Sequence, residues 1–337
     1  MARIFHARVE PLGCSFSISD NEPILSGAHR AGIALPFECG WGSCGSCKAI
    51  LVSGETRLLF AEAPAIRPHD RKRGRIILCQ SAACSDVVLT VPPQVREDGP
   101  NREEIPKPYV GTLLASEDLS PEIRRIVFRL NKASSYKEGQ YAILTLKPGL
   151  RRAYSMANLS GDNVVEFIVR SGPGVGTQML WDLEAGDTVP MELPYGSMFL
   201  RPRVHQPVLI AGGTGIAPIL ALMRSLSARR HSGQLIPGGY LFYGARNPGE
   251  LVLHQEMRQR ADNLSFSAFF SVDHPLTPWT GEVGTVVDML EGKLPKPWDL
   301  SSYLFYLAGP PLMVQRTYQA LMNRGVAISA VSYDSFG

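Results

Sequence analysis

The stretch that decides the first domain is Cys39-Gly-Trp-Gly-Ser-Cys44-Gly-Ser-Cys47, which holds three of the six cysteines of the chain. A fourth, Cys79, follows after an interval of 31 residues. This C-x4-C-x2-C…C spacing is the one that plant-type 2Fe–2S clusters use for their thiolate ligands. The spacing therefore predicts that these four cysteines hold a 2Fe–2S cluster.

The glycines between the cysteines fit the same prediction. A loop that wraps a four-atom cluster must point backbone N–H groups at the sulfur atoms, and Gly40, Gly42 and Gly45 allow the positive φ angles that this needs. A structural zinc site is the alternative, but zinc loops usually place C-x2–4-C pairs around a single ion. Clustered cysteines in a reducing compartment point to metal or redox chemistry rather than to disulfides.

Two other features of this region lie outside the ligand set. Cys14 and Cys84 fit no ligand position, and we expect both to be small buried hydrophobic residues of strands. The run His-Asp-Arg-Lys-Arg-Gly-Arg at 69–75 is strongly basic and lies just before the fourth ligand. We expect it to form a solvated loop, with a docking face for an electron acceptor as the alternative.

Composition describes an ordinary globular protein: 337 residues, 45% hydrophobic and 19% charged. The formal net charge of +3 is too small to indicate a nucleic-acid or membrane-surface partner. No apolar run approaches the roughly 20 residues of a membrane span, and the N-terminal residues lack the apolar core of a signal peptide. We therefore expect a cytoplasmic protein without nucleic-acid or membrane partners.

A stretch rich in proline and charge at 94–107 predicts a linker between a first domain, 1–93, and the rest of the chain. The first domain shows two strands, a helix beginning near Asn21, a loop and a strand. The second, 108–204, shows six short strands at regular spacing, the pattern of an antiparallel barrel. The third, 205–337, alternates strands and helices, which predicts a parallel sheet with helices on both faces. The expected fold class is multidomain, α+β and α/β.

The sequence Arg152-Ala153-Tyr154-Ser155 lies on a predicted barrel strand. Flavin binding needs a cation for the pyrophosphate, an aromatic face for the isoalloxazine ring and a hydroxyl near the ring nitrogens. Strand alternation places Arg152 and Tyr154 on one face and Ser155 on the other. These four residues predict a flavin site, with an edge-strand arginine and a core tyrosine as the alternative.

A glycine-rich loop, 172–177, follows the barrel strand 164–170 and precedes a predicted helix at 177–183. Free N–H groups at the start of a helix bind anions, so we expect the flavin pyrophosphate there. The further flavin contacts that we expect are Val169, Arg170, Gly174, Val175, Gly176 and Thr177.

Three segments at the carboxyl ends of predicted strands indicate a dinucleotide site in the last domain, since doubly wound folds bind their ligands at that edge. The first is a G-x-G-x-x-P loop, and the others follow the strands near 243 and 307. The expected contacts are Gly213, Thr214, Gly215, Ile216, Ala217, Pro218, Gly244, Arg246, Gly309, Pro310 and Met313.

The residues after the second of these strands bear on cofactor choice. The 2′-phosphate of NADPH would need two or more cations, whereas the chain offers Arg246 with Glu250 four residues later. A carboxylate opposes the phosphate and accepts a hydrogen bond from a ribose hydroxyl. The sequence therefore favours NADH.

Together these motifs resemble the reductase components of bacterial multicomponent aromatic-ring oxygenases. Residues 3–92 look like a plant-type β-grasp ferredoxin, R-x-Y-S looks like the flavin motif of ferredoxin–NADP reductases, and G-x-G-x-x-P looks like their nicotinamide loop. RAYSMANL (152–159) and LLFAEAPAI (58–66) resemble the reductases of carbazole dioxygenase and of toluene and phenol monooxygenases. The family usually has cysteine where this chain has Ala308.

The resemblance implies that Arg152 contacts the flavin phosphates and that Tyr154 stacks on the ring. It also implies that Phe336 covers the opposite ring face until nicotinamide displaces it, although a C-terminal aromatic that merely packs between the domains remains the alternative. Tyr154, Ser155 and Phe336 are the expected catalytic residues. NADH delivers a two-electron hydride, a cluster accepts one electron, and FAD mediates between them.

The implied function is an NADH-dependent reductase that passes single electrons to a terminal oxygenase or to a separate ferredoxin. The oxygenase then hydroxylates an aromatic or hydrocarbon substrate. Three alternatives stay open: the same electron chain serving a deoxysugar dehydrase, a flavin and iron–sulfur redox sensor without turnover, and a protein with structural zinc.

Overall fold

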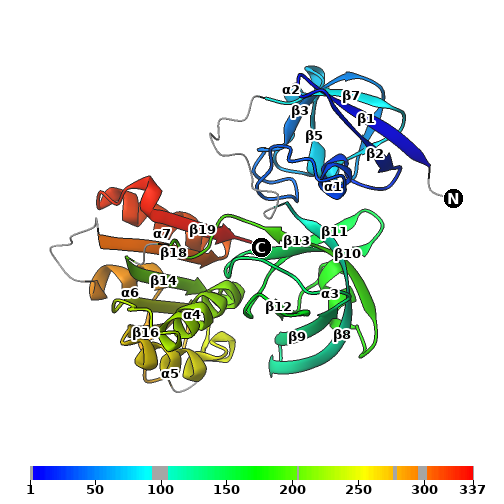
Figure 1. The fold of residues 1–337 in the computed structure, drawn as a ribbon. Helices are drawn as coiled ribbons and strands as arrows, with labels where there is room; N and C mark the ends of the chain where they lie inside the picture. Colours follow the sequence, from blue (N-terminus) through cyan, green and yellow to red (C-terminus); the bar gives the residue numbers. More distant parts are fainter. Residues whose placement is uncertain (1–2, 93–104, 203–204, 276–278, 295–301, 337) are drawn as a thin grey trace. The chain divides into compact units, whose positions relative to one another are not determined.

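The computed structural model describes residues 3–92, 105–202, 205–275, 279–294 and 302–336 (Figure 1). Internal contacts divide the chain into two compact units. Unit 1 comprises Met1–Gly111, Ala142–Ala153 and Thr188–Gly196, and unit 2 comprises Thr112–Tyr141, Tyr154–Asp187 and Ser197–Gly337. Unit 1 therefore combines the cysteine-rich module with three segments of the middle module. In the described part of the chain, no helix is long and apolar enough to cross a membrane.

The N-terminal module is a five-stranded sheet with one helix packed on it, as a β-grasp fold requires. Its strands follow the order β2-β1-β7-β3-β5, with β1 and β2 antiparallel and β1 and β7 parallel. The strands of this sheet are β1 (Ile4–Glu10), β2 (Cys14–Ser19), β3 (Lys48–Ser53), β5 (Arg75–Ile77) and β7 (Val87–Thr90). A two-stranded sheet pairs β4 (Thr56–Leu58) with β6 (Ser81–Ala83). Helix α1 (Ile24–Arg30) buries Ile24 and Leu25 in the core.

The structure corrects three expectations for this module. Helix α1 begins three residues after Asn21, with Pro23 at its N-cap, because proline disfavours the helical conformation of the residue before it. Cys84 is exposed on the bend after β6 rather than buried, and Cys14 is only half-buried. The basic run is not a loop throughout, because Pro68–Lys72 forms the short helix α2.

The middle module has the six predicted strands, in one sheet ordered β11-β10-β13-β8-β9-β12. The predicted segments match β8 (Lys107–Ser120), β9 (Ile123–Leu130), β10 (Tyr141–Lys147), β11 (Leu150–Ser155), β12 (Val164–Arg170) and β13 (Thr188–Tyr195). Helix α3 (Val175–Trp181) follows β12 and starts two residues earlier than predicted. Most of the predicted linker, residues 94–104, lies outside the described residues, as do 203–204 at the second boundary.

The last module is a six-stranded sheet ordered β17-β16-β15-β14-β18-β19, and every pairing in it is parallel. Its strands are β14 (Gln206–Gly212), β15 (Tyr240–Ala245), β16 (Ser267–Val272), β17 (Glu282–Val283), β18 (Tyr303–Gly309) and β19 (Val331–Ser335). The helices are α4 (Ile216–His231), α5 (His254–Leu264), α6 (Val286–Lys293) and α7 (Pro311–Asn323). The predicted parallel sheet is confirmed; β17 and α6 were not predicted.

Strand alternation divides the core of this module between two faces of the sheet. Leu209 and Ala211 of β14 belong to one buried cluster, which includes residues of α4 and α5. Val208 and Ile210 of the same strand belong to a second, which includes residues of α6 and α7. A strand buried on both faces must be continuously apolar, and Pro207–Gly212 are all buried. The layered core leaves the carboxyl ends of the strands for ligand binding.

Candidate cofactor and electron-transfer sites

The four predicted cluster ligands lie together as two pairs. The backbone N–H groups of Ser43 and Cys44 donate to Cys39 Sγ at 3.3 and 3.4 Å, and Cys39 N–H donates to Cys44 Sγ at 3.4 Å. The sulfur atoms of Cys47 and Cys79 lie 3.2 Å apart. The described residues contain no group of three or more His, Cys, Asp or Glu side chains arranged for a single metal ion. Two thiolates for each of two irons is the ligand set of a 2Fe–2S cluster.

Within each of these cysteine pairs, the pKa values of the two thiols shift in opposite directions. The hydrogen bond from Cys39 lowers the pKa of Cys44 to about 5, while the same bond, with burial, raises the pKa of Cys39. Likewise the hydrogen bond from Cys79 lowers the pKa of Cys47, and that of Cys79 is raised. Iron would displace the thiol protons, because metal binding requires thiolates. The four cysteines and the N–H groups aimed at their sulfur atoms fit a bound cluster.

The loop conformation depends on its glycines. Gly40, Gly42 and Gly45 all have positive φ angles, as predicted. A Cβ on Gly40 would lie 2.3 Å from Cε1 of Tyr195 and 2.7 Å from Cδ1 of Ile143. Both of those residues belong to barrel strands within unit 1. One edge of the cluster loop therefore lies directly against the barrel strands, at a distance that only glycine permits.

A buried polar network joins the same two parts of unit 1. Glu192 Oε2 of β13 accepts hydrogen bonds from Arg151 Nη2 at 2.8 Å, from Tyr195 OH at 2.8 Å and from Ser26 Oγ of α1 at 3.0 Å. Burial raises and Arg151 lowers the pKa of Glu192, with the net direction downward. His29 packs against Tyr195, with ring centroids 6.1 Å apart, and burial lowers its pKa to about 4. The network fixes helix α1 against the barrel strands.

The R-x-Y-S residues lie on β11, as predicted. Arg152 is exposed and its Nη1 donates to the Arg151 carbonyl at 2.9 Å, while Ala153 and Tyr154 are half-buried. The ring of Tyr154 lies edge-on to Phe167 of β12, with centroids 6.2 Å apart. Ser155 is buried, in accordance with the alternation of the strand. An exposed guanidinium and a partly exposed aromatic ring on one face suit a flavin phosphate and ring.

Ser155 has a partner that sequence reasoning missed. Its Oγ donates to Asp334 Oδ2 at 2.7 Å. Burial raises the pKa of Asp334 to about 6, against the smaller opposing effect of the Ser155 hydrogen bond. The backbone N–H of Phe336, two residues on, donates to the Gly309 carbonyl at 3.2 Å. The C-terminal strand thus ties Ser155 on one side to the third predicted nicotinamide segment on the other.

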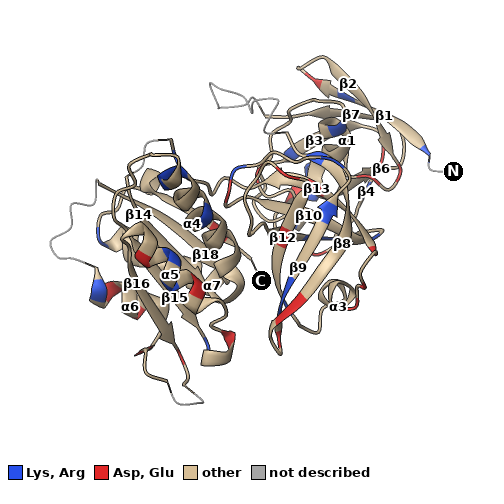
Figure 2. Cartoon of the chain, turned by 60° about the horizontal axis from the view of Figure 1, so that its bottom comes forward, with Lys and Arg blue, Asp and Glu red and all other residues tan. Residues whose placement is uncertain are grey.

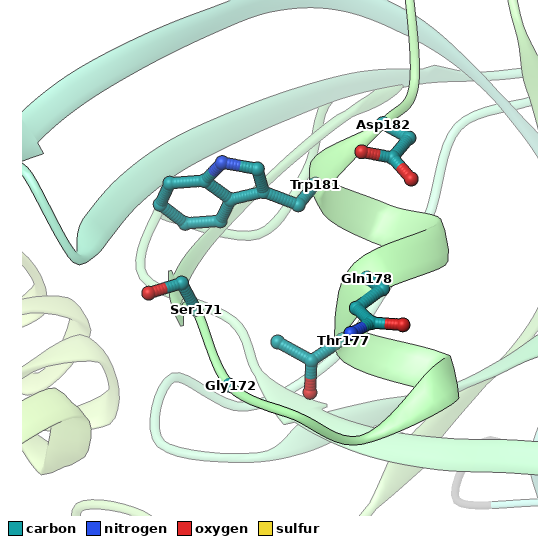
Figure 3. Close-up of a pocket in the computed structure, with 6 residues that line it drawn as sticks. All are labelled: Ser171, Gly172, Thr177, Gln178, Trp181 and Asp182. Carbon is teal, nitrogen blue, oxygen red and sulfur yellow. The ribbon is translucent and has the colours of Figure 1, made fainter.

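The second predicted flavin segment borders a cavity of about 340 Å³. Figure 3 shows Ser171 and Gly172 on the loop, facing Thr177 and Trp181 of helix α3 across the hollow. Arg124 covers the Trp181 ring, with its guanidinium carbon 4.2 Å from the centroid. A Cβ on Gly172 would meet no other atom within 4 Å. Gly174 is the N-cap of α3, so Val175, Gly176 and Thr177 form the first turn that was predicted to face the pyrophosphate.

The two remaining flavin candidates differ in their surroundings. Val169 is buried in β12, so its side chain contributes to the core. Arg170 Nη2 contacts Glu250 Oε2 and lies 3.5 Å from Glu122 Oε2. In this structure Arg170 is therefore bound to carboxylates, one of which belongs to the predicted nicotinamide set.

The three predicted nicotinamide segments meet at one edge of the parallel sheet. Gly212 pairs in register with Gly244, and Ala211 with Ala308. A Cβ on Gly215 would lie 2.1 Å from the Ala308 carbonyl oxygen, so only glycine allows α4 to begin this close to β18. The residues brought to this edge are Gly213, Thr214, Gly215, Ile216, Ala217, Pro218, Gly244, Gly309, Pro310 and Met313.

Glu250 is more constrained than the sequence indicated. Its carboxylate is nearly buried and contacts Arg246 Nη2 at 2.9 Å, Asn247 Nδ2 at 3.0 Å and Arg170. Both arginines lower the pKa of Glu250 against the opposing effect of burial. The sequence predicts that this carboxylate accepts a hydrogen bond from a ribose hydroxyl, but in the structure its oxygens contact the two arginines and Asn247. The carboxylate therefore offsets the charges of Arg246 and Arg170.

Comparison with known proteins matches three successive parts of the chain to family models. Residues 7–84 match the 2Fe-2S iron-sulfur cluster binding domain, 111–199 the oxidoreductase FAD-binding domain and 209–319 the oxidoreductase NAD-binding domain. The ferredoxin–NAD(+) reductase component of the alkene monooxygenase system of Xanthobacter autotrophicus is 31% identical over 332 residues, which cover 96% of this chain and 98% of that protein. The chain belongs to the reductase components of bacterial oxygenase systems.

Two further likenesses support the family assignment of this oxygenase reductase. The reductase component of phenol 2-monooxygenase from Pseudomonas sp. is 31% identical over 328 residues, covering 95% of this chain and 90% of the relative. The ferredoxin reductase of carbazole 1,9a-dioxygenase has a TM-score of 0.84 at 26% identity, and the match covers 100% of this chain and 99% of that one. The reductase thus binds the three cofactors of its family, a 2Fe–2S cluster, FAD and NAD.

A first prediction for this reductase concerns the nucleotide. We expect kcat/KM to favour NADH over NADPH by at least about tenfold, which corresponds to roughly 1.4 kcal/mol. Glu250→Ala and Glu250→Gln should shrink that preference, mainly by improving NADPH, because Arg246 and Arg170 would lose their counter-charge. Steady-state kinetics at one ionic strength test this, with the exposed Glu282→Gln as the control. Equal efficiency of both nucleotides in the unmutated protein would contradict it.

A second prediction concerns Asp334. Because its pKa is raised in the folded state, the folded chain holds a proton between about pH 4 and pH 6 that the unfolded chain releases. Stability is therefore lost as the pH rises through that window. Asp334→Asn, which keeps an oxygen for Ser155, should stabilise the protein by about 2 kcal/mol at pH 8 and by less at pH 5. Urea unfolding at the two values tests this, and an equal gain at both would rule out the raised pKa.

Proposed function

We propose that this protein oxidises NADH, places the hydride on FAD and delivers the electrons singly through its 2Fe–2S cluster to an oxygenase component or an intervening ferredoxin. When bound, FAD supplies the step between two-electron and one-electron chemistry. The reaction belongs in the cytoplasm, where thiols stay reduced. The organic substrate is then hydroxylated by the partner.

The residues of this chain do the binding and positioning. The N–H groups at the start of α4, together with Gly213 and its open surroundings, receive the NADH pyrophosphate. Arg152 holds a flavin phosphate, and Tyr154 supports one face of the flavin ring. Ser155, which donates to Asp334 at 2.7 Å, would hold its hydroxyl near the ring of a bound flavin. Phe336, whose backbone N–H donates to the Gly309 carbonyl, would cover the other ring face until nicotinamide displaces it.

One observation carries the proposal: one edge of the cluster loop is buried and another is exposed to solvent. Gly40 is buried against Tyr195 of the flavin barrel, whereas Cys44 is exposed. A cluster held by this loop would therefore face the barrel strands at a covered edge and a partner protein at an open one. A redox sensor without turnover would have no need for an open edge beside a covered one.

The names of the relatives support an oxygenase as the acceptor, since those proteins serve alkene, phenol and carbazole oxygenases. A second acceptor class is a haem monooxygenase. A cytochrome P450 reductase of Amycolatopsis has a TM-score of 0.79 at 26% identity, with 98% of both chains covered. Both acceptors take electrons one at a time, so the reductase would act in the same way on each.

The test is NADH oxidation coupled to cytochrome c. We expect about two molecules of cytochrome c to be reduced for each NADH, since a hydride carries two electrons. The purified protein should first be checked for flavin and iron–sulfur absorption. Bound cofactors without NADH oxidation would indicate the redox sensor instead, and NADH oxidation without cytochrome c reduction would show that electrons do not leave by the cluster.

A further inference from the structure

The cluster ligands differ sharply in exposure. Cys79 is fully buried, and Cys39 and Cys47 are 8% and 3% exposed. Cys44 and its neighbour Ser46 are exposed. Electron transfer between proteins requires close approach to the cluster, so a protein acceptor has to dock on the side of Cys44.

The surface beside Cys44 is hollowed and basic. A cavity of about 300 Å³ begins at Cys44 and Gly45 and is bordered by cationic side chains, among them Lys48, Arg67 and Arg75. Three more cations, Arg71, Lys72 and Arg73, follow on α2 and at its C-cap and are exposed. We call the six residues Lys48, Arg67, Arg71, Lys72, Arg73 and Arg75 the cationic rim; the Lys and Arg residues of the module are blue in Figure 2.

A buried carboxylate organises the cationic rim. Asp70 accepts hydrogen bonds from Lys48 Nζ at 3.1 Å, from Arg75 Nη1 at 3.2 Å and from the Arg67 N–H at 3.2 Å. The Arg67 N–H, followed by Lys48, holds the pKa of Asp70 well below its usual range. One carboxylate offsets one of the six charges, and the acidic residues near the loop, Glu38 and Glu62, do not balance the rest. The rim therefore keeps a net positive charge.

We propose that the cationic rim is the docking surface for the electron acceptor, and that the acceptor presents carboxylates to it. The proposal deepens the proposed function, on which it rests, by assigning the partner's surface chemistry. Charge complementarity of this kind raises the rate of productive encounter more than the affinity. It also makes the rate fall with ionic strength, since the Debye length is about 10 Å at 0.1 M salt.

The test compares two protein acceptors of opposite charge. One is the soluble haem domain of a cytochrome b5, whose haem edge is acidic, and the other is cytochrome c, whose haem edge is basic. The variant carries Arg71→Glu, Lys72→Glu and Arg73→Glu, whose side chains are not among the hydrogen-bond partners of the Asp70 carboxylate. At low salt we expect its second-order rate with cytochrome b5 to fall by about tenfold or more, and that with cytochrome c to rise.

The matched control carries Arg129→Glu, Lys147→Glu and Arg230→Glu, three exposed cations outside the ferredoxin module. It changes the net charge of the protein by the same amount. It therefore distinguishes an effect of the cationic rim from an effect of the overall charge. The proposal is overturned if both variants behave alike, or if the rim variant leaves both rates unchanged. Ferricyanide reduction by NADH is measured in parallel. If the unmutated protein reduces neither ferricyanide nor cytochrome, the proposed function has failed rather than the docking surface.

Discussion

Replacing Cys44 with Ser is expected to remove the cluster while flavin stays bound, and to lower NADH–cytochrome c activity by at least about a hundredfold. Cys44 is one member of a ligand pair, and its sulfur accepts backbone N–H groups from Cys39 and Ser46 at 3.4 Å. A serine hydroxyl offers iron a far less suitable ligand than a thiolate. Ferricyanide draws electrons from flavin directly, so its reduction should persist.

The matched control is Cys84→Ser, which also exchanges an exposed cysteine of the same module. It should keep the 2Fe–2S absorption and both activities. Iron content, the visible spectrum and the two acceptor assays together decide the outcome. Undiminished cytochrome c reduction in Cys44→Ser would show that the ligand assignment is wrong.

Arg152→Ala is expected to weaken flavin binding by about 1.5–3 kcal/mol, through loss of a charge-assisted phosphate contact. This corresponds to roughly ten- to a hundredfold in dissociation constant. The guanidinium of Arg152 is exposed on β11, so its removal should leave the barrel intact. Flavin content after gel filtration and a fluorescence titration with FAD measure the effect.

Lys147→Ala on β10 is the control, since it removes an exposed cation of the same sheet outside the R-x-Y-S motif. A fully flavinated Arg152→Ala of unchanged affinity would place the phosphate contact elsewhere, with the loop at Gly172 as the next candidate.

Sequence was most informative where chemistry demands a fixed spacing. The cysteines of the loop and the glycines at the carboxyl ends of the last sheet could be predicted as ligand contacts from local sequence. A cluster or a pyrophosphate needs the backbone to approach closely, and this restricts which residues a short segment can contain. Strand boundaries such as β9 and β12 followed from alternation, because each strand has one buried face.

Partners that meet only through tertiary structure left no local signal. Asp334 lies 179 residues from Ser155 along the chain, and Asp70 accepts a hydrogen bond from Lys48, which lies 22 residues before it. Likewise, nothing in the sequence near Glu250 shows that Arg170 reaches it from another module. Cys84 was misplaced because its flanking residues are strand-like, whereas the strand ends one residue before it.

The central claim is that electrons pass from NADH through flavin to the cluster, and an anaerobic titration with NADH tests it most directly. FAD takes two electrons and the cluster takes one, so reduction should end at about 1.5 NADH per chain. The flavin and the iron–sulfur bands should both bleach, and the reduced cluster should give a paramagnetic signal. Reduction that ends at about one NADH per chain, with the iron–sulfur bands unchanged, would contradict the account.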